Sequence, residues 1–262
     1  MKTMTTGKIP VGYPSKNAKA VLLVGGLGTR LRPVVASTPK PLASVGDRPF
    51  LELLVRQLCH QGIRHLILCT GYLAHEIEKE FGDGHKWDVT IEYSKEPRAM
   101  GTAGAVKFAE PFLRDVSDFL VMNGDSFVEI DFQSLIHFHR NCGGIASMAV
   151  LRMKNEMRYG TVQVTSGGRV SGFTEKSSAG SNGLVNAGVY VFNRRILDHI
   201  PEGPASLEKD IFPKLLDQGV YASKQDGVFI DIGTPEDYVR AQELFRRLEE
   251  AACPKQASAN PE

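Results

Sequence analysis

The chain has 262 residues, 42% of them hydrophobic, with 31 Lys and Arg against 30 Asp and Glu and a formal net charge of +1. This length and composition suffice for one large globular domain or two closely joined ones, and they exclude a disordered or fibrous protein. The balanced charge gives no field that would attract nucleic acid or an anionic membrane, so any recognition of phosphate must be local.

Strands and helices alternate in the first half of the chain. A short apolar run at 19–24 that ends in glycines predicts a buried parallel strand. Apolar residues repeat at helical spacing between Phe50 and Leu58, which predicts a helix. Further strands are expected at 65–70, 89–93 and 118–123, and further helices at 74–81 and 101–110. This alternation predicts a doubly wound α/β sheet over residues 18–140.

The second half is richer in closely spaced β runs. Strands are expected at 145–153, 159–165, 169–175, 184–193 and 227–233, with a helical stretch at 206–216. The last helix is expected to begin at the string TPED, because Thr234 can cap it, Pro235 suits its first turn and Asp237 lies near the positive end of its dipole.

The ends of the chain and its cysteines indicate the compartment. Residues 1–17 and 252–262 are polar and predict flexible tails, and no apolar run has the length of a signal peptide or a membrane span. The four cysteines share no CxxC spacing, which is typical of reduced thiols in a cytosolic protein. We therefore expect a soluble, cytoplasmic protein without a membrane partner.

The loop after the first predicted strand carries Gly25, Gly26 and Gly28, followed closely by Arg30. Because glycine backbone amides can approach phosphate oxygens, the string AVLLVGGLGTRLRP at 20–33 predicts an anion site. The dinucleotide-binding fingerprint needs a third glycine where Leu31 stands, and the phosphate loop GxxxxGK[ST] does not occur in the sequence.

Lys40 stands between Pro39 and Pro41 shortly after this loop. The prolines fix the local backbone, so the ammonium group can be held over the same anion. A glycine-rich turn alone is often only a turn, whereas these glycines, an arginine and a proline-flanked lysine together indicate a site.

Six strings carry a resemblance to a known family. They are GGLGTRLRPVVASTPKPL at 25–42, GTAGA at 101–105, NGDS at 123–126, FTEK at 173–176, NAGVY at 186–190 and DIGTPEDY at 231–238. In this order they resemble the sugar-1-phosphate nucleotidyltransferases. The resemblance implies a Rossmann-like, doubly wound, mostly parallel mixed sheet flanked by helices, with a β-rich sugar-binding portion. It also implies one domain over 18–250, with a nucleotide-binding half at 18–140 and a sugar-phosphate-binding half at 141–250.

The resemblance also implies roles for individual residues. The catalytic residues would be Arg30, Lys40, Asp125 and Lys176. The nucleotide would be bound by Gly25, Gly26, Gly28, Thr29, Arg30, Gly101, Thr102 and Ala103. The sugar phosphate would be bound by Tyr159, Gly160, Glu175, Lys176, Asn186 and Gly188. The metal ligands would be Asp125 and Asp231.

Elementary chemistry agrees with the metal assignment. Asp125 follows the predicted strand at 118–123, at the carboxyl edge where α/β sheets bind ligands, and Asp231 ends a β run in the same manner. Carboxylates from separate strands suit Mg²⁺, which binds few protein oxygens together with substrate phosphates. Each aspartate alone could also be a turn residue or a cap.

The expected reaction joins a sugar 1-phosphate to an NTP and releases pyrophosphate. The strings RLRPVV, RYGTV and SLEKD resemble most the branch that uses GTP and D-glycero-D-manno-heptose 1-phosphate. Mannose-1-phosphate guanylyltransferases and glucose-1-phosphate uridylyl- or thymidylyltransferases are the alternatives. The expected cofactor is Mg²⁺, and the expected partners are the NTP, a sugar 1-phosphate and no nucleic acid. Family members often associate, so the resemblance also allows a homo-oligomer.

Two other classes of protein compete with this interpretation. A nucleotide-dependent oxidoreductase also uses a glycine-rich loop, but the missing third glycine counts against it. A catalytically silent sugar-nucleotide-binding regulator would share the fold, although such proteins tend to lose the loop arginine or the metal aspartates, which are present here. His137 and His139 stand two apart on a predicted helix and do not share a face, so they do not predict a zinc site.

Overall fold

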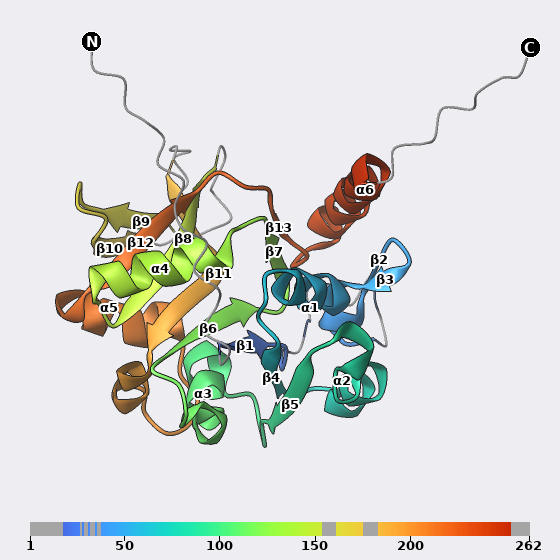
Figure 1. The fold of residues 1–262 in the computed structure, drawn as a ribbon, viewed down its shortest axis with the longest axis horizontal. Helices are drawn as coiled ribbons and strands as arrows, with labels where there is room; N and C mark the ends of the chain where they lie inside the picture. Colours follow the sequence, from blue (N-terminus) through green and yellow to red (C-terminus); the bar gives the residue numbers. More distant parts are fainter. Residues whose placement is uncertain are drawn as a thin grey trace, which may run out of the picture.

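The computed structural model describes residues 18–26, 28, 31, 35, 38–153, 161–174 and 183–252, with only the backbone for 174 and 247–252. Its centre is a mixed β-sheet with helices on both faces (Figure 1). This is the predicted fold class.

The strands are β1 (Lys19–Leu23), β2 (Ser44–Val45), β3 (Arg48–Pro49), β4 (His65–Thr70), β5 (Thr90–Lys95), β6 (Asp118–Asn123), β7 (Ser126–Val128), β8 (Ala146–Arg152), β9 (Thr161–Val164), β10 (Val170–Thr174), β11 (Leu184–Asn193), β12 (Val220–Gln225) and β13 (Phe229–Asp231). The α-helices are α1 (Phe50–His60), α2 (Ala74–Phe81), α3 (Gly101–Phe108), α4 (Phe132–Cys142), α5 (Phe212–Leu215) and α6 (Pro235–Ala252). Shorter helical turns are η1 (Lys40–Leu42), η2 (His85–Trp87), η3 (Glu110–Leu113), η5 (Arg194–His199), η6 (Leu207–Ile211) and η7 (Leu216–Gln218).

The main sheet has two parts with different strand directions. Strands β6, β1, β4 and β5 are parallel neighbours, so their carboxyl ends lie at one edge. Strand β11 runs antiparallel to β6 and also pairs with β8 and β9, which joins the β-rich second half to the first. Beyond it, β8 pairs in parallel with β12, and β9 pairs with β10.

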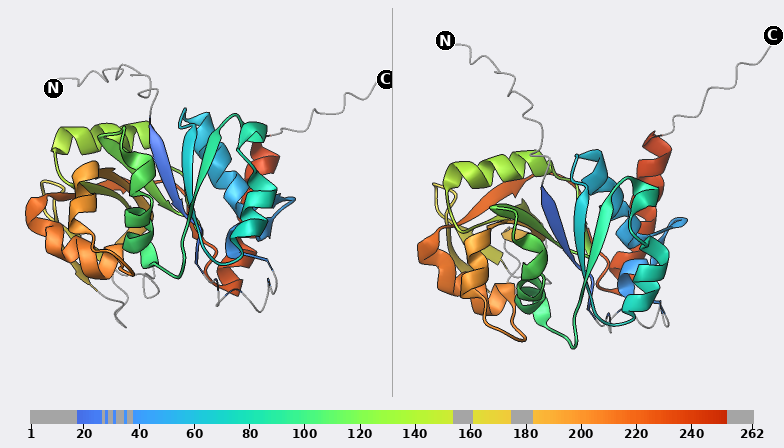
Figure 2. Two further views of the ribbon diagram at one scale, coloured as in Figure 1. Left: turned by 90° about the horizontal axis from the view of Figure 1, so that it is seen from below. Right: turned by 60° about the horizontal axis from the view of Figure 1, so that its bottom comes forward.

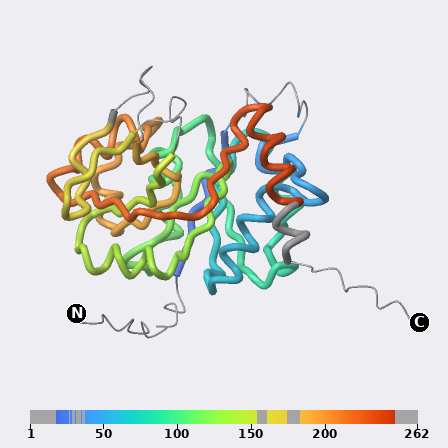
Figure 3. Tube along the Cα trace, turned by 90° about the horizontal axis from the view of Figure 1, so that it is seen from above, coloured from blue at the N-terminus to red at the C-terminus, as the bar shows by residue number. Residues whose placement is uncertain are grey.

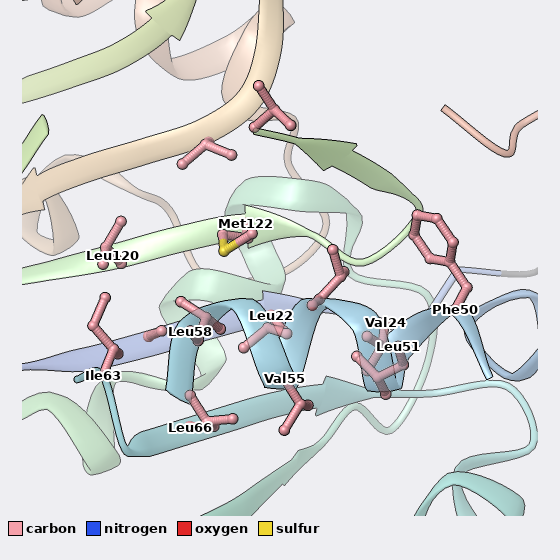
Figure 4. Close-up of a cluster of buried hydrophobic side chains, with 14 of the residues drawn as sticks. Leu22, Val24, Phe50, Leu51, Val55, Leu58, Ile63, Leu66, Leu120 and Met122 are labelled. Carbon is pink, nitrogen blue, oxygen red and sulfur yellow. The ribbon is translucent and has the colours of Figure 1, made fainter. Parts of the chain in front are cut away.

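Each face of the sheet is covered by its own layer of apolar side chains. Along β1, Ala20 and Leu22 belong to one buried cluster and Val21 to the other, as the alternation of a strand requires. The first cluster includes the apolar face of α1, from Phe50 to Leu58 (Figure 4). The second cluster contains α3 and the segment from η6 to α5, and Figure 2 shows these elements on the opposite side of the sheet from α1 and α2.

Helix α6 closes the first of these layers. Figure 3 shows the red trace of α6 beside the blue trace of α1. The Tyr238 hydroxyl and the Gln242 amide of α6 both donate to the carbonyl of Ser44 in the β2–β3 hairpin, and Phe245 meets Phe50 edge-on at 6.5 Å. Thr234 caps the helix as predicted, because its hydroxyl accepts from the Asp237 amide. The helix runs to Ala252, so it includes the first residue of the predicted C-terminal tail. The rest of that tail and residues 1–17 lie outside the described residues.

Several elements differ from the expectation, among them the short strands β2, β3 and β7, which were not predicted. The predicted helix at 101–110 ends at Phe108 and is followed by η3, where Pro111 interrupts the helical hydrogen bonds. The helical stretch at 206–216 consists of η6, α5 and η7 around Pro213. Strand β12 was not expected from the sequence. In the part of the chain that the structure describes, no helix has the length and apolar composition needed to cross a bilayer.

Candidate active site

The carboxyl edge of the parallel strands brings together residues that are distant in sequence. Gly25 and Gly26 follow β1, and Asp125 follows β6 beside it. Asp231 ends β13, which pairs with β7 so that Asp231 stands opposite Ser126. The amide of Ile232 donates to the carbonyl of Asp125 at 3.0 Å, and this bond fixes the two aspartates as neighbours.

The ammonium group of Lys40 lies between these two carboxylates. Its Nζ is 2.6 Å from Oδ2 of Asp125 and 3.7 Å from Oδ1 of Asp231. Lys40 opens η1, where Pro41 occupies the first turn and the amide of Ala43 donates to the Lys40 carbonyl. The side chain is only 10% exposed. The proline-flanked lysine is therefore held in place and aimed at the acidic pair, and its ammonium shows that this point attracts a cation.

Asp231 carries an unsatisfied acceptor. Its Oδ1 is buried and has no hydrogen-bond partner within the described ranges. Burial raises the pKa of Asp231, the charge of Asp125 raises it further, and Lys40 and the Gly233 amide oppose the rise. A buried carboxylate with more acceptor capacity than donors suits a divalent cation. In the described part of the chain, no three His, Cys, Asp or Glu side chains are grouped closely enough to hold a metal ion by themselves. Mg²⁺ would therefore need oxygens from substrate phosphates as well.

The three loop glycines have different reasons to be glycine. Gly28 has φ +57, and a Cβ there would lie 3.0 Å from the Cβ of Lys40. A Cβ on Gly25 would lie 2.5 Å from Oε1 of Glu96. Gly26 is exposed, and apart from its chain neighbours no atom of the described residues lies within 4 Å of its Cβ position. Gly25 and Gly28 thus let the chain pack closely, whereas Gly26 offers open backbone to a ligand.

Glu96 is a candidate site residue that the sequence interpretation missed. It follows β5 at the same sheet edge, and its Oε2 accepts from the Met100 amide at 3.1 Å. Burial raises its pKa, and the Met100 hydrogen bond opposes this rise. The signal was present in the sequence, because Glu96 follows a strand as Asp125 and Asp231 do.

The start of α3 is already occupied by protein contacts. The amides of Ala103 and Gly104 both donate to the carbonyl of Ala205, at 2.9 and 3.2 Å. Gly101 has φ +70, and a Cβ there would lie 2.5 Å from the same carbonyl oxygen. The hydroxyl of Thr102 donates to Glu208 and accepts from the Leu207 amide. Nucleotide binding by residues 101–103 remains a prediction, and the Ala103 amide is engaged elsewhere.

Asn186 and Gly188 lie on β11, where its pairing with β8 is irregular. The Gly188 amide donates to Oδ1 of Asn186 at 3.0 Å, and Gly188 has φ +71. A Cβ on Gly188 would lie 2.5 Å from Nδ2 of Asn123, so a larger residue would displace that amide. Sugar-phosphate binding by these two residues remains a prediction. The predicted site residues Thr29, Arg30, Tyr159, Gly160, Glu175 and Lys176 lie outside the described residues.

Comparisons with known proteins agree with this arrangement. A model of the family described as nucleotidyl transferase matches residues 19–247. A mannose-1-phosphate guanylyltransferase of Mycobacterium tuberculosis is 38% identical over 225 residues, which are 84% of this chain and 62% of that protein. The catalytic subunit beta of the same enzyme from Drosophila melanogaster is 36% identical over 230 residues, 87% of this chain and 62% of the relative. The chain thus spans 62% of the length of these curated relatives.

A solved structure extends the likeness to three dimensions. HddC from Yersinia pseudotuberculosis, complexed with GMP-PN, matches with a TM-score of 0.78 at 32% identity, over 87% of this chain and 99% of that one. The family model covers far more than half of the sequence, and the mixed sheet with its acidic edge is the fold that the six strings implied. The chain belongs to the sugar-1-phosphate nucleotidyltransferase family.

Proposed function

We propose that the protein joins a sugar 1-phosphate to an NTP and releases pyrophosphate, with GTP and D-glycero-D-manno-heptose 1-phosphate as its substrates. The observation that carries this proposal is the Lys40 ammonium held between Asp125 and Asp231 at the carboxyl edge of the sheet. Such a cluster suits a reaction in which two polyanions must be brought together.

The transfer asks for positioning and charge neutralisation rather than proton removal. An oxygen of the sugar phosphate forms a bond to the α-phosphorus of the NTP, and the bond from that phosphorus to the bridging oxygen of the β-phosphate breaks. The electron pair leaves with pyrophosphate. The attacking phosphate is already anionic, so no general base is required, and Lys40 donates its N–H groups to phosphate oxygens as charge shifts between them.

Asp125 and Asp231 are the residues that would hold Mg²⁺. The buried Oδ1 of Asp231, which accepts no hydrogen bond among the described residues, fits a cation, as does the acidic pair as a whole. When bound, Mg²⁺ supplies positive charge that neutralises the triphosphate and orients it. The open backbone at Gly26 lies on the same edge and supports binding of the phosphate chain there.

Glu96 supports guanine as the base. An ionised carboxylate is a pure acceptor, and Oε2 of Glu96 is fixed by the Met100 amide. Guanine offers two adjacent donors, N1–H and N2–H₂, on one edge. Uracil and thymine offer one N–H between two carbonyl oxygens, which a carboxylate would repel. The relatives named guanylyltransferases and the GMP-PN complex of HddC support the same choice.

The identity of the sugar is the most specific part of the proposal. D-glycero-D-manno-heptose and mannose share the configuration of their ring hydroxyls and differ by one exocyclic carbon. The strings RLRPVV and SLEKD support the heptose, whereas the relatives named above support mannose 1-phosphate as the second candidate.

A substrate matrix tests the proposal. The common NTPs are combined with heptose, mannose and glucose 1-phosphates, with Mg²⁺ or with EDTA, and pyrophosphate release is measured. We expect release with GTP and a manno-configured sugar 1-phosphate only when Mg²⁺ is present. Asp125→Asn should remove most of the turnover, and Asp226→Asn, which changes an exposed aspartate, should not. No release from any combination would refute the proposal.

A further inference from the structure

Tyr190 lies at the centre of a hydrogen-bond chain that connects the two predicted halves of the site. Its hydroxyl accepts from Nδ2 of Asn186 at 2.8 Å and donates to Oε1 of Glu208 at 3.1 Å. The other carboxylate oxygen of Glu208 accepts from the hydroxyls of Thr102, at 3.0 Å, and Ser206, at 2.9 Å. The chain therefore runs from β11 through η6 to the start of α3.

The local backbone of β11 is shaped to make this connection. In a regular strand, residues four apart are separated by about 13 Å along the strand. The pairing of β11 with β8 shifts between Asn186 and Tyr190, and Gly188 within that interval has φ +71. The shift brings the Asn186 amide within hydrogen-bond reach of the Tyr190 hydroxyl, as strand irregularities near active sites commonly re-aim a side chain.

The tyrosine is fixed on all sides. Its ring is fully buried and stacks on Phe192 at 5.5 Å, with Phe212 at 5.4 Å. Burial, followed by the charge of Glu208, raises the pKa of Tyr190 well above its ordinary value, so the hydroxyl keeps the proton that it donates to Glu208. A rigid ring with a protonated hydroxyl holds both neighbours in one orientation.

We propose that Tyr190 is a positioning residue for the sugar 1-phosphate, acting through the Asn186 amide and the Glu208 carboxylate. The proposal rests on the nucleotidyl transfer proposed above. Removal of the hydroxyl leaves Nδ2 of Asn186 and Oε1 of Glu208 without their shared partner, and both groups can then turn away from the geometry that the sugar site requires. The triphosphate site at Lys40 and Asp125 has no direct hydrogen bond to this chain among the described residues.

The test is the variant Tyr190→Phe, assayed for both substrates. One hydrogen bond corresponds to a change of about three- to tenfold, so we expect the KM for the sugar 1-phosphate to rise by that factor. The KM for the NTP and kcat should stay within about twofold of wild type, because Lys40 and Asp125 make no hydrogen bond to the Tyr190 hydroxyl among the described residues. Tyr93→Phe is the matched control, because it also deletes one hydroxyl that bonds within the protein, to the Gly82 carbonyl.

A second variant keeps the test decisive if Tyr190→Phe is unstable. Glu208→Gln has the same shape but cannot accept at both oxygens, and it should raise the same KM. Because the two residues form one chain, the double variant should show less than the product of the single effects. The positioning role would be overturned if Tyr190→Phe lowered kcat and raised both KM values by the same factor. It would also be overturned if the KM for the sugar 1-phosphate were no higher in Tyr190→Phe than in Tyr93→Phe. Wild-type turnover in the same assay reports on the proposed function separately.

Discussion

Polar groups are satisfied differently at the carboxyl edge of the parallel strands and in the irregular stretch of β11. At the edge, a buried oxygen of Asp231 accepts no hydrogen bond among the described residues, and Lys40 stands between two acids. On β11, the amide of Asn186 and the hydroxyl of Tyr190 are engaged within the protein. Unsatisfied charge marks a place where ligands complete the structure, whereas a satisfied network marks a scaffold that orients them.

The largest effect is expected when the positive charge between the two aspartates is removed. Lys40→Met leaves Asp125 and Asp231 facing each other without the ammonium, so we expect kcat to fall by about 10²- to 10³-fold. In EDTA the variant should melt below wild type because the two carboxylates repel. Mg²⁺ should raise its melting temperature more than that of wild type, as scanning fluorimetry can measure.

Lys107→Met is the matched control for that experiment. Lys107 is also largely buried and pairs with Glu110 at 2.7 Å, but it lies on α3 away from the acidic pair. Its melting temperature should fall without any added response to Mg²⁺. An equal Mg²⁺ response in both variants would show that Lys40 does not occupy a cation site.

The next effect concerns base choice at the same edge. Glu96→Gln replaces a pure acceptor by an acceptor and a donor, which matches uracil and thymine better than guanine. We expect the ratio of kcat/KM for GTP over UTP to fall by about 10- to 100-fold. Glu92→Gln, on the strand β5 that Glu96 follows, should leave the ratio unchanged. An unaltered ratio in Glu96→Gln would remove this residue from the base site.

A smaller effect separates the roles of the loop glycines. Gly28→Ala places a Cβ at φ +57 and 3.0 Å from Lys40, so we expect the free energy of unfolding to fall by about 1–2 kcal/mol. Gly26→Ala meets no atom of the described residues within 4 Å of its new Cβ and should keep the wild-type stability while raising the KM for the NTP. Urea denaturation and steady-state kinetics measure both. Equal destabilisation by the two changes would contradict the distinction.

The smallest effect belongs to a third, buried polar pair. Nδ1 of His139 lies 2.9 Å from the Ser147 hydroxyl, and burial lowers the pKa of His139 below its ordinary value of 6.5, although Asp118 opposes this. Well above pH 6.5 the histidine is neutral in both the folded and the unfolded chain, so its full contribution to the stability of the fold is present. As pH falls below that value the unfolded chain takes up the proton first, and stability is lost.

The variant His139→Gln should therefore flatten the acid side of the stability curve. Below pH 6.5, the slope of the free energy of unfolding against pH should be smaller in the variant than in wild type. The difference should be at most that of one bound proton, which is about 1.4 kcal/mol per pH unit. His137→Gln changes an exposed histidine on the same helix and serves as the control. Parallel slopes in wild type and His139→Gln would show that another group causes the acid sensitivity.

The sequence predicted the parallel core well because its strands are continuous apolar runs. β4, β6 and β11 have the predicted bounds, and the acidic residues that follow strands meet as expected. Strand β12 was missed because VYASKQ mixes polar and apolar residues and is stabilised by its pairing with β8. The Tyr190 chain could not be foreseen, since it depends on a register shift and on an η6 carboxylate whose position only the tertiary fold defines.

The route by which Asp231 reaches its partner has a consequence for folding. It arrives on β13, which pairs with β7 only after the chain has completed β8 to β12 and returned across the molecule. Contacts between segments so far apart in the sequence form late in folding, because the entropy cost of closing a long loop comes before the stabilisation by the contacts. The parallel strands can assemble during synthesis without a complete acidic pair. The acidic pair that we propose to hold the cation is therefore completed late in folding, and chains that end before β13 lack Asp231.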